Sequence, residues 1–391
     1  MDTENLLKII HHRRSVRVYK TGKVSDQQLE TILEAARWAP SGANTQPWEF
    51  IVTRDRKKMK RVREIYANWM LDAKSRATAS LQSGPSGQLD QIEVPLVVVQ
   101  NLGYLNLHQF GTYDLFENAA TPKDRKWMIL APPAYELPVY AWQLEALAFF
   151  DHVLHGADNG YAAQPTVRYW LEGVNDYAGA ADFPLPQARE RRFYLASQGA
   201  DAVPHRLADE PGPGANSWAA VPLGLPILGG FDEVANQMLT FELTADRAMT
   251  LAGPVSLHLR FSSNEIDSHL VARLSRVGRD GSAHLLSLGA MSPARRHRDP
   301  ARDTACEIVH DTSVREPLVP GVPVDLEFSL TPGPTRLEPG DRLRLDVASR
   351  LDLLRSDVSH GYVHFDMPGP PYFARNTLHY GPQTYLTVQE A

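Results

Sequence analysis

The sequence has almost no cysteine and no long apolar run. Cys306 is its single cysteine, so the chain can form neither an internal disulfide framework nor a cysteine-rich metal site. No apolar stretch approaches the ~20 residues that a membrane-spanning helix needs. Residues 1–5 carry no basic segment followed by an apolar core, so they predict no secretory signal. We therefore expect a cytoplasmic protein with no membrane partner.

A strong excess of charge of one sign is also missing. Forty Lys and Arg residues against 46 Asp and Glu residues give a net charge of −6 over 391 residues. That balance produces no field large enough to predict nucleic acid or an anionic membrane as a partner. The length allows two or three hydrophobic cores. This composition is that of an ordinary soluble protein, and we expect its partner to be a small-molecule substrate.

The N-terminal part of the sequence is predicted to be mostly helical. Leu, Leu, Ile and Ile form an apolar stripe within residues 6–10. Ser25 is a suitable N-cap for a helix over residues 26–36, and a basic helix is predicted over residues 54–70. The Ser-Gly-Pro-Ser-Gly sequence of residues 83–87 indicates a loop.

Residues 94–160 alternate between strand and helix patterns. Residues 94–99 and 126–130 are continuous apolar runs, typical of strands buried on both faces. A helix pattern lies between them around residues 110–116, and another covers residues 140–154. This order predicts the end of a parallel α/β sheet.

From about Gln164 onward the sequence changes to short strands with alternating polar and apolar residues. Pro- and Gly-rich turns separate these strands, a pattern that indicates an all-β sandwich. Four predicted strands are residues 167–170, 239–243, 255–261 and 343–347.

A basic cluster near the N-terminus could hold a phosphate. Arg13, Arg14 and Arg17 can form charge-assisted hydrogen bonds to phosphate oxygens, and Ser15 adds a further donor. On residue types alone, the basic end of a helix is the alternative interpretation.

A second polar segment, Ala-Pro-Ser-Gly-Ala-Asn-Thr-Gln-Pro-Trp, spans residues 39–48. Its Ser41, Asn44 and Gln46 offer hydroxyl and amide groups suited to the edge of a flavin ring, and its prolines stiffen the loop. A capped helix–strand turn is the alternative here.

Together the two segments resemble the opening of the FMN-dependent nitroreductase family, over about residues 1–95. The resemblance implies an FMN cofactor, NAD(P)H as electron donor and a nitroaromatic or quinone acceptor. It places four residues at the flavin phosphate and the pyrimidine side of the ring: Arg13, Arg14, Ser15 and Arg17. It places five near the flavin from the second subunit of a homodimer: Pro40, Ser41, Gly42, Asn44 and Gln46. Asn68 is a further polar candidate, but no later segment resembles the second half of that family.

From about Val94 to its end, the chain resembles the C-terminal half of serine hydrolases of the cocaine-esterase and X-Pro dipeptidyl-peptidase type (CocE/NonD). The main likeness is in residues 148–160, AFFDHVLHGADNG, followed by PTVRYW in residues 165–170. Shorter likenesses are residues 183–186, 262–267 and 337–343. This resemblance implies the closing strands and helices of an α/β-hydrolase sheet, followed by a jelly-roll β-sandwich.

The catalytic groups of such a hydrolase are not evident. A Ser–His–Asp mechanism needs a nucleophilic serine, and its Gly-x-Ser-x-Gly turn is absent from the sequence. The loops expected to carry the acid and the histidine, residues 100–106 and 131–136, contain no suitable group. Asp114 could replace the acid, and His108 or His152 the base. His152 lies near a helix C-terminus, where contact with carbonyl groups is the commoner role.

No metal site is predicted. His11 and His12 are adjacent on a predicted helix and do not face one another. His297 stands alone in the Arg- and Asp-containing residues 295–299, which are typical of a solvated loop.

The sequence therefore predicts a mixed α/β plus all-β chain in three parts. They are a nitroreductase-like α+β fragment in residues 1–93, the end of an α/β-hydrolase core in residues 94–160 and a jelly-roll sandwich in residues 161–391. Three functions stay open: an FMN-dependent oxidoreductase, a hydrolase of esters or X-Pro peptides, and a non-catalytic fusion remnant. We favour the oxidoreductase narrowly, because only that hypothesis retains recognisable ligand contacts.

Overall fold

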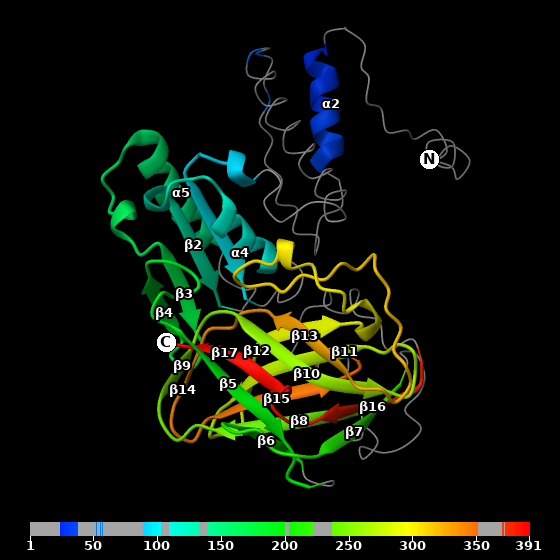
Figure 1. Cartoon of the computed structure of the whole chain (residues 1–391). Coiled ribbons are helices and arrows are strands. Elements are labelled where there is room, and N and C mark those ends of the chain that lie inside the picture. The colour runs from blue at the N-terminus through cyan, green and yellow to red at the C-terminus, as the bar shows by residue number, and fades with distance from the viewer. Residues whose placement is uncertain are drawn as a thin grey trace, which may run out of the picture. The chain divides into compact units, whose positions relative to one another are not determined.

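The structure, a computed structural model, has a mixed fold in which strands dominate (Figure 1). The chain divides into two compact units, residues 1–71 and residues 72–391. The described residues are 24–37, 52, 55, 57, 89–102, 109–132, 139–199, 203–221, 237–350, 370 and 372–391.

The first unit contributes one described helix, α2 (Asp26–Arg37). The Ser25 hydroxyl accepts a hydrogen bond from the Gln28 N–H at 3.2 Å, and the Gln28 side chain accepts one from the Ser25 N–H at 2.9 Å. These reciprocal bonds form a capping box, which satisfies two backbone donors at the start of the helix. The predicted N-cap is confirmed.

The second unit opens with a four-stranded sheet in the order β1-β2-β3-β4. Its strands are β1 (Leu96–Asn101), β2 (Lys126–Ala131), β3 (Val167–Leu171) and β4 (Asp176–Ala180). The first three strands run parallel, and β4 is antiparallel to β3. We refer to this sheet and its two helices as the α/β sheet.

Two helices cover opposite faces of the α/β sheet: α4 (Gln109–Asn118) and α5 (Val139–His155). Phe116 of α4 packs in one apolar cluster with Met128 of β2, whereas Phe149 of α5 packs in another with Trp127. Because successive strand residues point to opposite faces, this division makes three layers. Three short 3₁₀ turns complete the region: η2 (Leu89–Gln91), η3 (Lys123–Arg125) and η4 (Tyr161–Ala163).

Both predicted apolar strands exist, but their burial differs. Every residue of β2 is buried, as predicted for a central strand. The prediction that β1 is buried on both faces is wrong, because Val99 is 39% exposed. Within the described residues β1 is the first strand of the sheet, so one of its sides has no neighbouring strand.

The strand over residues 167–170 exists, but our assignment of it to the β-sandwich is wrong. It is part of β3, which pairs in parallel with β2 through Val167 and Met128. Alternating burial shows that one face of a strand is covered, but it does not identify the sheet to which the strand belongs.

The remaining strands form one 13-stranded sheet, which we call the β domain (residues 189–391). Its strands are β5 (Arg189–Ala196), β6 (His205–Ala208), β7 (Ala215–Ala220), β8 (Met238–Thr244), β9 (Met249–Leu251), β10 (Val255–Ser263), β11 (Leu270–Val277), β12 (Ala283–Met291), β13 (Val324–Leu330), β14 (Thr335–Leu337), β15 (Arg342–Ala348), β16 (Ala374–His379) and β17 (Tyr385–Glu390). All pair antiparallel except β6 with β8. Two 3₁₀ turns, η5 (Pro293–Arg295) and η6 (Pro300–Arg302), lie between β12 and β13.

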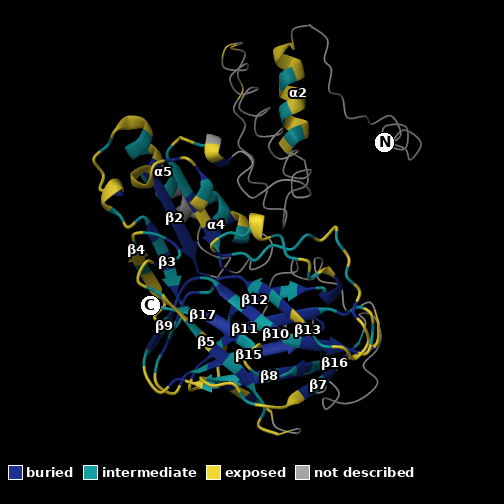
Figure 2. Cartoon of the chain, in the orientation of Figure 1, coloured by how far each residue is buried: buried dark blue, intermediate teal, exposed yellow. Residues whose placement is uncertain are grey.

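The inward faces of the β-domain strands share one large apolar core (Figure 2). Phe241, Leu257, Phe261 and Leu345 are fully buried in it. They come from β8, β10 and β15, where apolar residues alternate with outward polar ones. The period-two pattern therefore predicted these strands correctly.

The α/β sheet and the β domain are joined by backbone contacts around Glu172. Its N–H donates to the Pro334 carbonyl at 3.1 Å, and its carbonyl accepts from the Arg336 N–H at 2.8 Å. The following Gly173 has a φ of +93°, and a Cβ there would lie 2.4 Å from the Arg336 carbonyl oxygen. Only glycine fits this approach.

Candidate functional site

The carboxyl ends of the parallel strands are the usual ligand-binding edge of an α/β sheet. At this edge the buried Gln100 of β1 accepts a hydrogen bond from the Thr112 hydroxyl of α4 at 2.9 Å. The Gln100 amide also donates to the Asn101 carbonyl at 2.6 Å. These neutral groups hold α4 on the sheet but supply neither a nucleophile nor a base.

Gln109, the first residue of α4, links this edge to the β domain. Its buried amide nitrogen donates to the Tyr113 hydroxyl at 2.8 Å and to the Pro332 carbonyl at 2.7 Å. Burial raises the pKa of Tyr113 well above its usual value, so the phenol stays protonated. Burial likewise raises the pKa of the nearby Cys306 thiol, which removes its reactive thiolate form.

The proposed substitutes for a hydrolase triad are not assembled. Asp114 of α4 accepts a hydrogen bond from the Asn118 amide at 2.8 Å. His108 lies outside the described residues. The described starts of the two loops, Gln100–Leu102 and Ala131–Pro132, carry no carboxylate and no imidazole.

His152 has a structural position at the end of α5. Its Nδ1 lies 3.2 Å from the Ala157 carbonyl, which can only accept, so this nitrogen carries the proton. Asn159 closes the same turn: its amide donates to the Ala148 carbonyl at 2.8 Å and accepts from the Tyr161 N–H at 3.1 Å. The predicted contact of His152 with carbonyl groups is confirmed. Residues 148–160 thus form the end of a helix and the turn after it.

A half-buried ion pair of the α/β sheet was not predicted from the sequence. Arg168 of β3 donates through both terminal nitrogens to the carboxylate of Glu145 on α5. The Tyr161 hydroxyl donates to the same carboxylate at 2.6 Å, and burial together with this carboxylate raises the pKa of Tyr161. The three side chains fasten α5 to β3. The only signal for this pair in the sequence was Arg168 itself, a charged residue within the alternating pattern of residues 167–170.

A Ser–His–Glu cluster on the β domain does not have the geometry of a triad. The Ser256 hydroxyl lies 3.3 Å from Nε2 of His258, and a Glu327 carboxylate oxygen lies 3.4 Å from the same nitrogen. In a triad the serine and the carboxylate bind opposite nitrogens of the ring, so that the acid orients the base. Here both compete for one nitrogen.

Ser262 and His379 form a closer pair, with Oγ and Nε2 2.9 Å apart. Burial and the charge of Arg260 lower the pKa of His379, so the ring is neutral. However, Ser262 is only 6% exposed, and among the described residues no carboxylate acts on the His379 ring. This pair lacks both access and an orienting acid.

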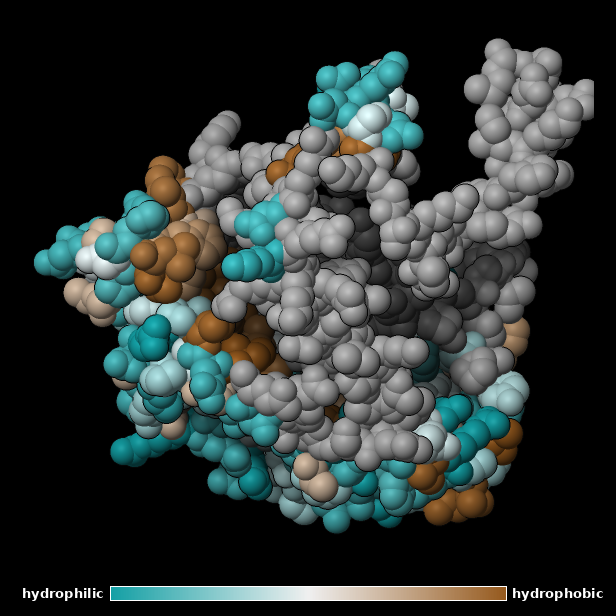
Figure 3. Space-filling view, turned by 90° about the horizontal axis from the view of Figure 1, so that it is seen from above, coloured by the Kyte–Doolittle hydropathy of each residue, from teal (hydrophilic) through white to brown (hydrophobic). Residues whose placement is uncertain are grey.

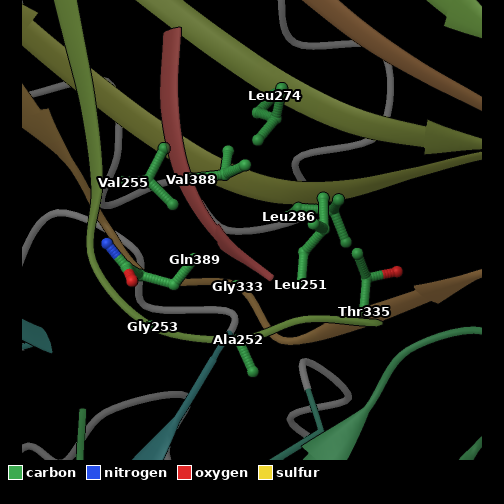
Figure 4. Close-up of a pocket in the computed structure, with 10 residues that line it drawn as sticks. All are labelled: Leu251, Ala252, Gly253, Val255, Leu274, Leu286, Gly333, Thr335, Val388 and Gln389. Atoms are coloured by element: carbon green, nitrogen blue, oxygen red, sulfur yellow. The ribbon is translucent and has the colours of Figure 1, made fainter. Parts of the chain in front are cut away.

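A small cavity lies in the β domain near the α/β sheet (Figure 4). Leu251, Val255, Leu274, Leu286 and Val388 give it a mainly apolar wall. Its interior has room for no more than about one water molecule, so it is not a substrate site.

No metal or membrane feature appears in the part of the chain that the structure describes. It contains no group of three or more His, Cys, Asp or Glu side chains able to hold a metal ion. Among the same residues, no helix is both long and apolar enough to cross a membrane.

The predicted flavin contacts lie outside the described residues and stay predictions. They are Arg13, Arg14, Ser15, Arg17, Pro40, Ser41, Gly42, Asn44 and Gln46.

The α/β sheet followed by the β domain has a counterpart among solved structures. A solved CocE/NonD family hydrolase from Staphylococcus aureus has this fold, with a TM-score of 0.63 and 20% sequence identity. The match covers 78% of this chain and 55% of that one. The profile of the X-Pro dipeptidyl-peptidase C-terminal non-catalytic domain matches residues 159–360, and the chain belongs to this family.

The N-terminal part is similar to a different family. The nitroreductase family profile matches residues 10–125. A "Putative NADH dehydrogenase/NAD(P)H nitroreductase" of Archaeoglobus fulgidus is 51% identical over 63 residues, which are 16% of this chain and 36% of that protein. The expected resemblance of the two parts of this chain to two different families is confirmed.

A curated relative supports the hydrolase resemblance in sequence as well. A "Putative serine esterase" of Mycobacterium bovis is 26% identical over 239 residues, or 55% of this chain and 36% of that protein. The chain thus spans about a third of the length of each of these two curated relatives.

Proposed function

We propose that the chain is an FMN-dependent oxidoreductase of the nitroreductase type, with NAD(P)H as electron donor and a nitroaromatic or quinone as acceptor. The observation that carries the proposal is the 51% identity over 63 residues to an NAD(P)H nitroreductase-like protein. FMN would supply the hydride chemistry. The described hydrolase-like part offers no competing catalytic constellation.

The donor set of the N-terminal segments suits FMN. Arg13, Arg14 and Arg17 provide guanidinium groups for a phosphate dianion, and Ser15 adds a hydroxyl. The Asn and Gln side chains of residues 40–46 can both donate and accept, as the pyrimidine edge of the flavin requires. In this proposal two chains pair as a homodimer, so that residues 40–46 reach the flavin of the partner.

The rest of the chain has a non-catalytic role in this proposal. Residues 1–93 are the flavin-binding part, residues 94–160 the remnant of a hydrolase core and residues 161–391 a jelly-roll module. The pairing of β3 with β2 supports extending the middle part through β4, to Ala180.

Absorbance tests the proposal directly. The purified full chain is expected to be yellow, with a band near ~450 nm that bleaches when NADPH is added anaerobically. Replacing Arg13 and Arg14 by Gln together should abolish the band. Arg279→Gln, which changes an exposed guanidinium of the β domain, is the matched control and should retain it. A colourless wild-type protein that takes up no added FMN would refute the proposal.

Ester or peptide hydrolysis is the second candidate, favoured by the fold of the CocE/NonD hydrolase. A fluorophosphonate probe distinguishes it, because this reagent labels activated serines. If the protein is colourless and the probe labels it, hydrolysis replaces oxidoreduction as the proposed function. A protein that neither binds flavin nor reacts with the probe would be a non-catalytic fusion remnant.

A further inference from the structure

The turn after α5 contains the one Asn-Gly pair of the whole sequence, Asn159-Gly160. Both residues are exposed, and Gly160 has a φ of +77°. A Cβ built at Gly160 would meet no atom of the described residues within 4 Å, so the space beside this residue is open to solvent. Because glycine has no side chain, nothing of its own shields its backbone nitrogen from the asparagine before it.

Two hydrogen bonds fix the orientation of the Asn159 side chain. Its amide nitrogen donates to the Ala148 carbonyl at 2.8 Å, and its amide oxygen accepts from the Tyr161 N–H at 3.1 Å. A carbonyl can only accept and an N–H can only donate, so the partners determine which side-chain atom is the oxygen. The bond to the residue two positions later forms an Asx turn, which folds the side chain back along the backbone of Gly160.

The hydrogen bond from Tyr161 also prepares the Asn159 side chain for nucleophilic attack. A backbone N–H that points at a carbonyl oxygen stabilises the negative charge that develops there when the carbonyl carbon is attacked. The chain itself keeps the Gly160 nitrogen within reach of Asn159 Cγ. Attack by this nitrogen closes a five-membered ring, so no second molecule has to be bound and oriented.

We propose that Asn159 is a site of spontaneous deamidation. The Gly160 nitrogen loses its proton and forms a bond to Asn159 Cγ, while the bond from Cγ to Nδ2 breaks and Nδ2 takes up a proton and leaves as ammonia. Water then opens the cyclic imide at one of its two carbonyl carbons and returns a proton to the Gly160 nitrogen. The net reaction converts asparagine and water into aspartate or isoaspartate and ammonia, and it needs neither a cofactor nor an oxidant.

Either product removes a bond that holds the end of α5. A carboxylate has no hydrogen to donate to the Ala148 carbonyl, so two acceptors would face each other. Its negative charge is also unfavourable near the C-terminal end of a helix. Deamidation therefore loosens the last turn of α5.

The effect extends to Tyr161, the residue that follows the modified pair. Its ring contacts Trp127 of β2 with centroids 5.1 Å apart, and its hydroxyl donates to Glu145 of α5 at 2.6 Å. A change in the turn thus reaches the contacts that fasten α5 to the α/β sheet. This inference does not depend on the flavin proposal, because all of its residues belong to the α/β sheet and the turn after α5.

Mass spectrometry of the digested full chain tests the site after incubation in neutral and in mildly alkaline buffer. Aspartate and isoaspartate are expected at position 159, and faster in the alkaline buffer because the Gly160 nitrogen must lose a proton. Asn175, which is exposed in the turn between β3 and β4 but precedes Asp176, is the internal control and should stay unmodified. A synthetic peptide of residues 156–163 is the reference for the unfolded sequence. A folded chain that keeps Asn159 intact while the peptide reacts would overturn the proposal.

Two variants separate the chemistry from its consequence. Gly160→Ala should slow the reaction at Asn159, since the added methyl group hinders ring closure, and an unchanged rate would refute the role assigned to Gly160. Asn159→Asp reproduces one product and should accelerate hydrogen exchange in residues 150–155, with β10 unchanged. Equal exchange in the wild type and this variant would refute the loosening of α5.

Discussion

The α/β sheet and the β domain differ in how completely they bury their apolar side chains. The inward side chains of the β domain, such as Phe261 and Leu257, have no exposed surface. By contrast, the outward face of α5 exposes Leu144, Leu147 and Leu154 to between 56% and 69%. Apolar surface gathers on the same side in Figure 3, at the left of the view.

This difference distinguishes a region that encloses its own core from one whose described sheet has an open edge. The strands of the β domain surround their own core, whereas the described α/β sheet has an open side at β1. The CocE/NonD hydrolase fold, of which the chain covers 55%, contains further chain beyond the match. We therefore expect the β domain to resist unfolding more strongly than the α/β sheet, and four variants test this.

The largest effect is expected from Phe261→Ala in the closed core. Removing a fully buried phenyl ring next to Trp218 should lower the free energy of unfolding by about 3–5 kcal/mol. Urea unfolding followed by tryptophan fluorescence measures this loss. The control is Phe373→Ala, whose ring is 61% exposed and whose change should be negligible. Similar effects of both variants would contradict a closed core.

A smaller effect is expected from Arg168→Met in the α/β sheet. The variant leaves the Glu145 carboxylate without its cation. Breaking a buried pair is strongly destabilising, but both side chains keep some contact with water, so about 1–3 kcal/mol is expected. Hydrogen exchange should accelerate in α5 and stay unchanged in β10.

Arg206→Met, at an exposed position on β6, is the matched control for the ion pair. Faster hydrogen exchange in β10 as well as in α5 of Arg168→Met would show that the two regions unfold together. The expected difference in their resistance to unfolding would then be wrong.

The pH dependence of the β domain should come partly from His205. Burial lowers the pKa of this imidazole, so the unfolded chain binds its proton more readily than the folded one. The contribution of neutral His205 to the free energy of unfolding is therefore fully present above the unfolded pKa of about 6.5. It is lost as the pH falls through the folded pKa. His205→Phe, which keeps a ring against Phe241, should make the thermal midpoint less sensitive to acid. An equal acid sensitivity in both proteins would rule out this role.

The smallest effect is expected from Leu147→Glu on α5. This side chain is mostly exposed, so the free energy of unfolding should change by less than about 0.5 kcal/mol. Circular dichroism during thermal unfolding is sufficient to measure it. A fall of several degrees in the thermal midpoint would mean that the outer face of α5 is covered in solution. The α/β sheet and the β domain would then differ less in how completely they bury their apolar side chains.

Local signals in the sequence were the most informative about the fold. The Ser25 cap, the buried strand β2 and the alternating strands of the β domain were predicted correctly, because each depends on neighbouring residues. The sheet to which β3 belongs was not predictable, since pairing with β2 joins residues far apart in the sequence. The Arg168–Glu145 pair was missed for the same reason: the partners are 23 positions apart on different elements.

The candidate site shows the same limit. The missing Gly-x-Ser-x-Gly turn and the structural role of His152 could both be inferred from sequence, because a motif and a helix end are local features. The contact of Gln109 with Pro332 could not, because 223 positions separate the two residues. The nine flavin residues lie outside the described part, so their roles stay predictions.

The backbone hydrogen bonds of Glu172 hold the α/β sheet against the β domain without any help from the peptide that links the two. Its two backbone hydrogen bonds, together with that from Gln109 to Pro332, hold strands on either side of residues 181–188. A protease that cuts this connection would thus yield two fragments that still elute as one species. We expect that separating the two fragments would require denaturant. The hydrogen bonds at Glu172 hold the two sheets together, whereas the linking peptide only connects them covalently.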